Sequence, residues 1–412
     1  MDAYHQHAFR TRMTSIALNA RATQTLIDDC VTQAKSVAGK STDPQVVISP
    51  YRFNPLGAHI DHQGGQVLAR CLNQYTILCF WPSGSGQCSV YANLECGEWQ
   101  STEFWPSELQ DEYDWDSMAR ASFTALADFA QTDQGIDAVV FGTMVSCGLS
   151  SSASVILAYL SALADVNNIE LTPQDLVELS RRVENDYRGL NNGVQDQMSI
   201  VFGQEKSLSL LDVEAVSASH IADPTDMDRF RFLMCYSGVS RNLTGSSFNI
   251  RVAECRAAAQ SLYAEADHLG QVPLTLRSSE RINALPDLLA RRARHVYGEM
   301  ARVALGATAW MDGDITRFGQ LMNQSCQSSI HNYESGSEWL IALHEIAREI
   351  PGVYGNRFSG GGYGGCLFML VDKNRVEDIA VQLLDSYTGL YPELEGIAKV
   401  LLAESESTVR LV

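Results

Sequence analysis

The chain has 412 residues, of which 45% are hydrophobic, and its formal net charge is −19 at pH 7. That length accommodates one large domain or two ordinary ones, each with its own core. The acidic surface disfavours nucleic acid as a partner, because it repels a phosphate backbone. The first residues lack a signal-peptide pattern, and no apolar run reaches the ~18 residues of a membrane span. We therefore expect a cytoplasmic protein that binds neither nucleic acid nor membrane.

The ten cysteines are irregularly spaced and include no Cys-x-x-Cys pair, so neither a zinc ribbon nor a thioredoxin-type site is indicated. In a long chain without a signal peptide we expect them to be reduced thiols. Cys147 and Cys366 lie in glycine-rich segments, where small residues that fit tight turns are the simplest interpretation.

The first half of the chain alternates apolar runs with amphipathic segments. In chain order these predict a helix within residues 5–40, strands at 46–48, 68–81, 88–94 and 137–141, helices at 153–166 and from 172, and a strand at 208–213. The first strand is expected to end at Pro50, because proline cannot donate to a ladder. Thr172, Pro173 and Asp175 mark a helix start, since they combine a capping hydroxyl, a first-turn proline and an acidic third residue.

A polar stretch at residues 217–228 separates the two halves, and we place the domain boundary between residues 214 and 215. The second half predicts a strand at 230–236, helices at 252–266, 288–304, 315–324 and 337–350, a Gly-rich strand and turn at 357–370, and a helix near 375–387. Strands alternating with helices in two halves indicate an α+β or α/β fold.

The first chemical motif, residues 49–65, holds Arg52, His59, Asp61 and His62 on a segment punctuated by Pro and Gly. Such a stiff turn suits a hydroxyl-rich ligand, because one carboxylate can accept two sugar hydroxyls. The His-x-Asp-His pattern also resembles a metal cluster, although no further ligand set is evident. A third interpretation is that these residues only satisfy local backbone groups.

The second motif, residues 146–153, reads Ser-Cys-Gly-Leu-Ser-Ser-Ser-Ala and directly precedes an apolar helix. Exposed N–H groups and the helix dipole make such a helix start an anion site. One of the three serine hydroxyls is also a potential Mg²⁺ ligand. The motif is not a P-loop, because the Lys is missing. The alternative is a Ser-rich helix cap without a ligand.

The third motif, residues 359–366, has five glycines in six positions before an apolar strand. It implies positive φ angles or a backbone that passes close to something. Three interpretations stay open: a tight hairpin, a loop against a nucleotide, or a loop against the second motif. Two further carboxylates are candidates. Asp196 lies in a polar turn and Glu184 near a helix end, where an acidic residue ordinarily just faces water.

In order and spacing, these segments resemble the GHMP kinase superfamily (galactokinase, homoserine, mevalonate and phosphomevalonate kinases), from about Val46 to Val371. The resemblance implies a two-domain α+β fold. Residues 1–214 would form a ribosomal S5 domain 2-like domain with the sugar motif and the phosphate loop. Residues 215–412 would form a ferredoxin-like α/β domain with the third motif. The implied small-molecule partners are ATP, Mg²⁺ and a sugar or sugar acid, and the oligomeric state stays open.

The pattern Arg-x-Asn-x-x-Gly-x-His-x-Asp-x-x-Gly-Gly is similar to that of the galactokinase branch, with one change. Galactokinases carry Gly-Glu-His where this chain has Gly57-Ala58-His59, a variant that resembles the galacturonokinases. The family's Glu accepts a hydrogen bond from a sugar hydroxyl and would repel the C6 carboxylate of galacturonate. The resemblance thus implies a galacturonate 1-kinase. The alternatives are a galactokinase or other hexose or uronate kinase, and a non-catalytic sugar-sensing regulator.

The resemblance also implies residue roles. Asp196 would take the proton of the anomeric hydroxyl, and Arg52 would lie between that hydroxyl and the γ-phosphate. The remaining positions fall into three groups. The implied sugar-binding positions are Ala58, His59, Asp61 and Gly193. The implied ATP-binding positions are Ser146, Gly148, Leu149, Ser150, Ser151, Ser152, Gly361 and Gly362. The implied Mg²⁺ ligands are Ser152 and Glu184.

Several positions depart from the family pattern. Ser146 stands where the family has Gly. Tyr51 replaces the Gly before the arginine, and it would either reach the sugar or fill space. Phe248 stands where the branch has a sugar-contacting Tyr. Arg241 is our candidate for the cation that a C6 carboxylate needs. A regulator would be expected to lose part of the catalytic set, which is complete here, and this favours an enzyme.

Overall fold

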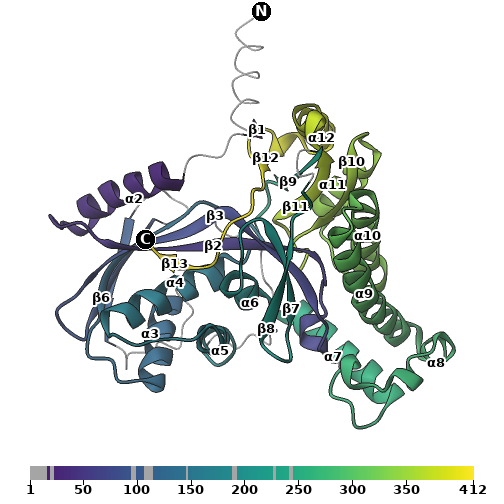
Figure 1. The fold of residues 1–412 in the computed structure, drawn as a ribbon, viewed down its shortest axis with the longest axis horizontal. Helices are drawn as coiled ribbons and strands as arrows, with labels where there is room; N and C mark the ends of the chain where they lie inside the picture. The colour runs from purple at the N-terminus through teal and green to yellow at the C-terminus, as the bar shows by residue number, and fades with distance from the viewer. Residues whose placement is uncertain are drawn as a thin grey trace, which may run out of the picture.

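The computed structural model describes residues 16–18, 23–93, 99–105, 115–144, 147–187, 193–225, 229–240 and 245–412, except the side chains of residues 245–248. This part of the chain forms two β-sheets with helices packed around them (Figure 1). The first-half elements are β1 (Ile16–Ala17), α2 (Thr23–Ala38), β2 (Gln45–Leu56), the 3-10 turn η1 (Asp61–Gln63), β3 (Val67–Pro82), β4 (Cys88–Asn93), β5 (Trp99–Phe104), α3 (Ser117–Phe129), β6 (Ile136–Gly142), α4 (Ser151–Val166), α5 (Pro173–Asn185), α6 (Gln195–Val201), β7 (Ser207–Asp212) and β8 (Ser217–Ala222).

The second-half elements are β9 (Phe230–Tyr236), α7 (Gly245–Leu262), α8 (Ser279–Asn283), α9 (Asp287–Met311), α10 (Ile315–Ser328), the π-helical turn η5 (Ser329–Tyr333), α11 (Glu338–Glu349), β10 (Val353–Phe358), β11 (Cys366–Asp372), α12 (Val376–Leu390), β12 (Lys399–Leu402) and β13 (Arg410–Leu411). Among the described residues, no helix is long and apolar enough to cross a membrane. The expected cap of α5 is confirmed, because Thr172 and Asp175 form a reciprocal capping box.

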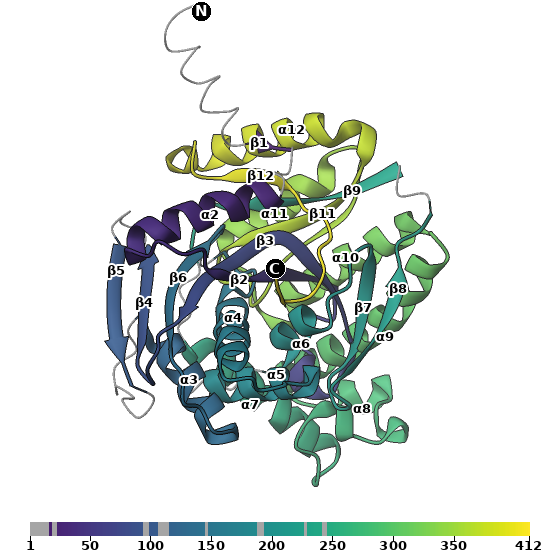
Figure 2. The same ribbon diagram turned by 60° about the vertical axis from the view of Figure 1, so that its left-hand side comes forward.

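The first sheet has the strand order β13-β2-β3-β6-β4-β5, with β7 paired to β3 and β8 to β7. Helix α2 covers one face, while α3 and α4 cover the other (Figure 2). Val46 and Ile48 pack with α2, whereas Val47 packs on the opposite face. Since successive strand residues point to opposite faces and both faces are covered, the strand reads as a continuous apolar run.

Strand β2 runs past Pro50 to Leu56, so the expectation that it ends at Pro50 was wrong. The ladder with β3 is irregular between Pro50 and Tyr51. Strand β13, on the other side of β2, pairs only with Val47 and Ile48. A proline at such an irregularity leaves the rest of the ladder intact. Strand β2 therefore includes Arg52 and the first part of the first motif.

The second sheet has the order β1-β12-β9-β11-β10 (Figure 1). Two sequence-based boundaries need correction. The helix expected within residues 5–40 begins at Thr23, because Ile16 and Ala17 pair with β12 instead. The boundary between residues 214 and 215 falls inside the β7–β8 hairpin, so the first sheet extends to Ala222. Strands β1 and β13 each join the sheet of the other half of the chain.

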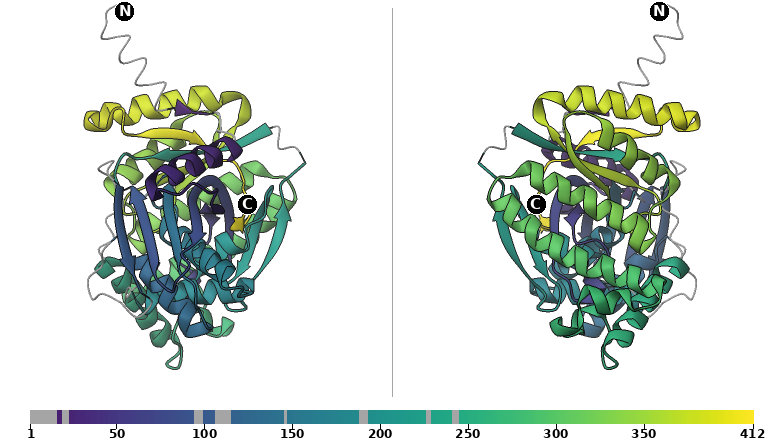
Figure 3. Two further views of the ribbon diagram at one scale, coloured as in Figure 1. Left: turned by 90° about the vertical axis from the view of Figure 1, so that its left-hand side faces the viewer. Right: turned by 90° about the vertical axis from the view of Figure 1, so that its right-hand side faces the viewer.

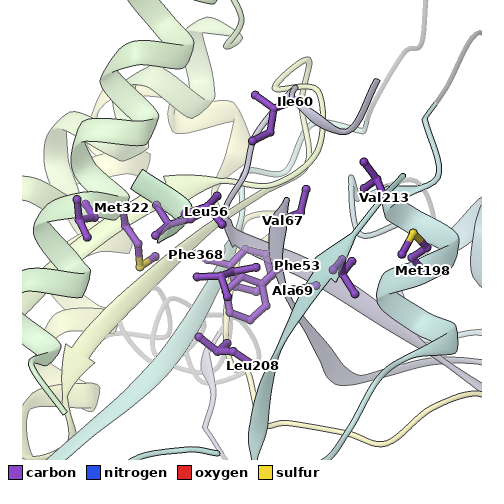
Figure 4. Packing of buried hydrophobic residues seen from close by; sticks show 14 of the residues in the cluster. Phe53, Leu56, Ile60, Val67, Ala69, Met198, Leu208, Val213, Met322 and Phe368 are labelled. Atoms are coloured by element: carbon purple, nitrogen blue, oxygen red, sulfur yellow. The ribbon is translucent and has the colours of Figure 1, made fainter. Parts of the chain in front are cut away.

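The second sheet packs one face on α11 and α12 and the other face toward the first motif. Helices α9 and α10 lie side by side along this region (Figure 3). The ring of Phe53 stacks on Phe368 at 4.3 Å and meets Phe232 edge-on at 5.0 Å. This aromatic contact, with Leu56 and Met322 beside it, fills the space between the two sheets (Figure 4). It fixes where the polar end of β2 lies relative to the third motif.

Candidate active site

Arg52 and Asp196 form a partly buried ion pair at the centre of the site. Arg52 lies on β2 and is 1% exposed, while Asp196 lies in the first turn of α6. The Nε and Nη2 atoms of Arg52 both donate to Asp196 Oδ1, at 3.0 and 2.7 Å. Both bonds go to one carboxylate oxygen, so neither occupies Oδ2.

Arg52 also brings the three motifs together. Its Nη1 donates to the hydroxyl of Ser359 in the third motif at 3.0 Å, and to the carbonyl of Gly148 in the second motif at 3.5 Å. Its backbone N–H donates to the carbonyl of Leu149 at 3.2 Å. Segments separated by up to 307 residues in the sequence therefore meet around one guanidinium.

Asp61 lies beside the loop that carries Asp196. Its carboxylate accepts from His62 Nδ1 at 3.3 Å. Burial alone would raise the pKa of Asp61, but hydrogen bonds from His62 and from the Gln195 backbone outweigh burial and hold the pKa below its ordinary value. A Cβ on Gly193 would lie 2.0 Å from Asp61 Oδ2. Glycine at position 193 thus allows the two segments to touch.

His59 and Ala58 form the turn between β2 and Asp61. His59 has the positive φ of 59°, and its Nε2 atom lies 3.1 Å from the Ser335 hydroxyl. Its ring stacks on Tyr333 at 4.3 Å with an interplanar angle of 10°. Ala58 is 4% exposed, and both its N–H and its C=O are bonded within the protein. Its side chain leaves this turn without the carboxylate that the galactokinase pattern has there.

The second motif forms an open helix start. Gly148 has a φ of 73° and Ser150 a φ of 62°, and Ser150 is the N-cap of α4. The Ser150 side chain makes no cap bond, and its buried Oγ has no hydrogen-bond partner in the described part of the chain. Ser151 and Ser152 lie partly exposed in the first helical turn. A plain Ser-rich cap is therefore not supported, and the N–H groups of this turn suit an anion.

The third motif passes close to the second. A Cβ on Gly365 would lie 2.3 Å from the Cys147 carbonyl, and one on Gly148 would lie 3.5 Å from the Gly364 carbonyl. By contrast, Gly362 has a φ of 83°, is buried against Phe358 and accepts a bond from Ser337 N. Of the three interpretations, a loop against the second motif fits this placement. Gly361 is likewise buried, so the expected contact of Gly361 and Gly362 with ATP is not supported by their surroundings.

The ends of α4, α5 and α6, three helices that contact one another, carry oxygens of the type that a hard cation takes. Glu184 is 2% exposed near the end of α5, and its Oε2 accepts from Gln197 Nε2 at 2.8 Å. Two buried oxygens, Ser150 Oγ and Gln197 Oε1, have no hydrogen-bond partner among the described residues. A buried carboxylate with hydroxyl and amide oxygens at neighbouring helix ends is the donor type that Mg²⁺ takes. The described residues contain no His/Cys/Asp/Glu cluster of three or more, which argues against the His-x-Asp-His metal interpretation.

Tyr51 is placed differently from its expected contact with the sugar. It is 1% exposed and packs in the core, and burial raises the pKa of its hydroxyl. This placement supports the space-filling interpretation. Ser146, Arg241 and the side chain of Phe248 lie outside the described residues.

Sequence reasoning missed three residues that hydrogen-bond to the first motif. Ser359 was visible within the third motif, but nothing local predicted its bond to Arg52. His295 and Glu299 lie four residues apart on α9 and are both 0% exposed. In an amphipathic helix such polar residues are expected to face water, so the sequence offered no signal for their burial.

Three family profiles match this chain. They are described as GHMP kinases N terminal domain, over residues 118–204, GHMP kinases C terminal, over residues 301–389, and Galactokinase galactose-binding signature, over residues 35–82. The galacturonokinase of Arabidopsis thaliana is 35% identical over 396 residues, which cover 89% of this chain and 93% of the relative. The galactokinase of Staphylococcus carnosus is 30% identical over 357 residues, which cover 84% of this chain and 90% of the relative.

Solved structures give the same picture. The crystal structure of Lactococcus lactis galactokinase complexed with galactose matches with a TM-score of 0.85 at 26% identity, covering 93% of this chain and 99% of that one. The Methanococcus jannaschii mevalonate kinase matches with a TM-score of 0.62 at 14% identity, covering 89% of this chain and 100% of that one. The second likeness concerns the fold alone.

Proposed function

Because this chain belongs to the GHMP kinase superfamily and is an ATP-dependent sugar kinase of its galactokinase branch, we propose that it phosphorylates D-galacturonate. The reaction would convert ATP and D-galacturonate to ADP and galacturonate 1-phosphate. The support comes from the Arg52–Asp196 pair for the chemistry and from Ala58 for the choice of sugar.

The proposed chemistry begins at the anomeric hydroxyl. Asp196 Oδ2, which neither Arg52 bond occupies, takes the hydroxyl proton. The sugar oxygen then bonds to the γ-phosphorus as the bond from phosphorus to the β–γ bridging oxygen breaks, and ADP carries away the electron pair. Arg52 holds the Asp196 carboxylate in place and offers positive charge to the transferring group.

The phosphate chain would lie along the start of α4. The N–H groups of Ser151 and Ser152 lie at the positive end of the helix dipole, which favours an anion. Ser152 and Glu184 would hold Mg²⁺. When bound, Mg²⁺ neutralises phosphate charge and supports in-line transfer. Gly365 packs against the Cys147 carbonyl of this loop.

Ala58 is the observation that carries the choice of substrate. It lies on the turn between the strand of Arg52 and Asp61, where a galactokinase has a glutamate. Without that carboxylate the turn accepts a sugar whose C6 is itself a carboxylate. The 35% identity to a galacturonokinase agrees with this choice. We also propose a cytoplasmic location, which is the expectation from the irregular spacing of the cysteines.

The test is ADP release with Mg-ATP and galacturonate, glucuronate, galactose and glucose under identical conditions. We expect the highest kcat/KM with galacturonate. Preference for galactose would keep the mechanism and make Ala58 incidental. Preference for glucuronate would keep the charge argument and change the stereochemistry at C4. No turnover of any of the four sugars would refute galacturonate as the substrate and favour an untested sugar or a sugar-binding regulator.

A further inference from the structure

The turn that carries Ala58 is held from the second half of the chain. Glu299 Oε1 accepts from the backbone N–H of Gly57 at 2.8 Å and of Ala58 at 3.2 Å. His295 Nε2 lies 3.0 Å from the carbonyl oxygen of Ala58. Because residues four apart lie on one face of a helix, α9 presents both side chains to the turn together. Both polar groups of the Ala58 backbone are therefore bonded to α9.

The chemistry of the partners fixes the tautomer of His295. A carbonyl oxygen only accepts, so Nε2 carries the proton and donates to Ala58. Nδ1 then accepts from the Ser328 hydroxyl at 3.0 Å. Burial lowers the pKa of His295 to about 4, which keeps the ring neutral at physiological pH. A neutral ring is what this pair of bonds requires.

Glu299 joins the same turn to the third motif. Its carboxylate also accepts from the Ser325 hydroxyl at 2.6 Å and from Arg302 Nε at 2.7 Å. Arg357 Nη1 lies 3.8 Å from Glu299 Oε1 and donates to Ser325 Oγ at 2.9 Å. A fully buried carboxylate is costly unless it is paired and hydrogen-bonded. Arg357 lies two residues before Ser359, the hydroxyl that Arg52 contacts, so the contacts continue to the catalytic centre.

The backbone of the turn needs such support. His59 adopts a positive φ of 59°, a conformation that a non-glycine residue keeps only when its surroundings impose it. His59 and Asp61, the residues expected to contact sugar hydroxyls, follow Ala58 directly. A shift of the Ala58 peptide would therefore displace both of them.

We propose that His295 and Glu299 are positioning residues for sugar binding, which lock the Gly57–His59 turn against the third motif. The inference rests on the proposed role of this turn in holding the sugar. It predicts that loosening the turn weakens sugar binding while leaving ATP binding nearly unchanged, because the second motif is held by the backbone and side chain of Arg52 and by its close approach to Gly365.

The test compares His295→Leu with His344→Leu as a matched control. His344 is also 0% exposed and hydrogen-bonded, but its partner is Asn356 and not the Gly57–His59 turn. Steady-state kinetics use the best sugar of the panel, and thermal unfolding reports stability. We expect His295→Leu to raise the sugar KM by about tenfold or more with the ATP KM within about twofold. His344→Leu should lower the Tm about as much as His295→Leu does, but it should not raise the sugar KM relative to the ATP KM.

Two further variants sharpen the test. His295→Gln keeps a donor near the Nε2 position and should recover part of the sugar affinity. Glu299→Gln should likewise raise the sugar KM and leave the ATP KM nearly unchanged. If Glu299→Gln does not fold, the comparison of His295→Leu with His344→Leu decides. An unchanged sugar KM in His295→Leu, or a rise of the sugar KM and the ATP KM by the same factor, would overturn the proposal. If the panel selects another sugar, only the proposed substrate fails, because the KM comparison is then made with that sugar.

Discussion

Ala58→Glu tests the charge argument for substrate choice most directly. The substitution restores the carboxylate of the galactokinase pattern on the turn between Arg52 and Asp61. Two carboxylates about 4 Å apart repel by about 4 kcal/mol at an effective dielectric constant of 20. That energy corresponds to roughly a thousandfold loss in kcat/KM for a uronate. A neutral hexose feels no such repulsion.

The structure adds a second carboxylate to this calculation. Glu299 accepts a bond from the Ala58 N–H at 3.2 Å, so a glutamate at position 58 would lie near it as well. This repulsion is present with either sugar and cancels in a ratio. The readout is therefore the kcat/KM for galacturonate divided by that for galactose, measured in wild type and variant.

Ala58→Gln is the matched control, because it has the size of glutamate without the charge. We expect the ratio to fall by about three orders of magnitude in Ala58→Glu, and by far less in Ala58→Gln. An equal loss on both sugars would sink the charge argument. Equal effects of Glu and Gln would show that size, and not charge, controls the choice.

Three other variants make separate predictions. Asp196→Asn should abolish turnover while ATP binding by calorimetry stays measurable, and near wild-type turnover would remove Asp196 as the base. Gly193→Ala should push Asp61 aside, since the new Cβ would lie 2.0 Å from its Oδ2, and should raise the sugar KM about ten- to hundredfold with little change in Tm. His295 has a folded-state pKa of about 4, lowered by burial from 6.5, so the unfolded chain binds the proton first and stability is lost as pH falls from 6.5 to 4. Between pH 7 and pH 5, urea unfolding of His295→Leu should therefore lose about 2 kcal/mol less than wild type, and identical losses would contradict the assigned pKa.

The sequence alone determined the family and its two-domain α+β fold, both of which the comparisons confirm, and it predicted the residue types of the candidate site. This was possible because each motif is local. A run of glycines, a serine-rich helix start and an Arg–His–Asp segment keep their chemistry within a few neighbouring residues. The helix cap at Thr172 was predictable for the same reason.

The tertiary structure alone decided which of these residues meet and which are buried. Tyr51 points from β2 into the hydrophobic core. The motif alone does not show which face of the strand Tyr51 lies on and which face Arg52 lies on. The bond from Arg52 to Ser359 joins residues 307 apart, and the bond from Gly57 to Glu299 joins residues 242 apart. Such contacts depend on how the two sheets and α9 pack. No local pattern encodes that packing, because the same polar residues on a helix normally face water.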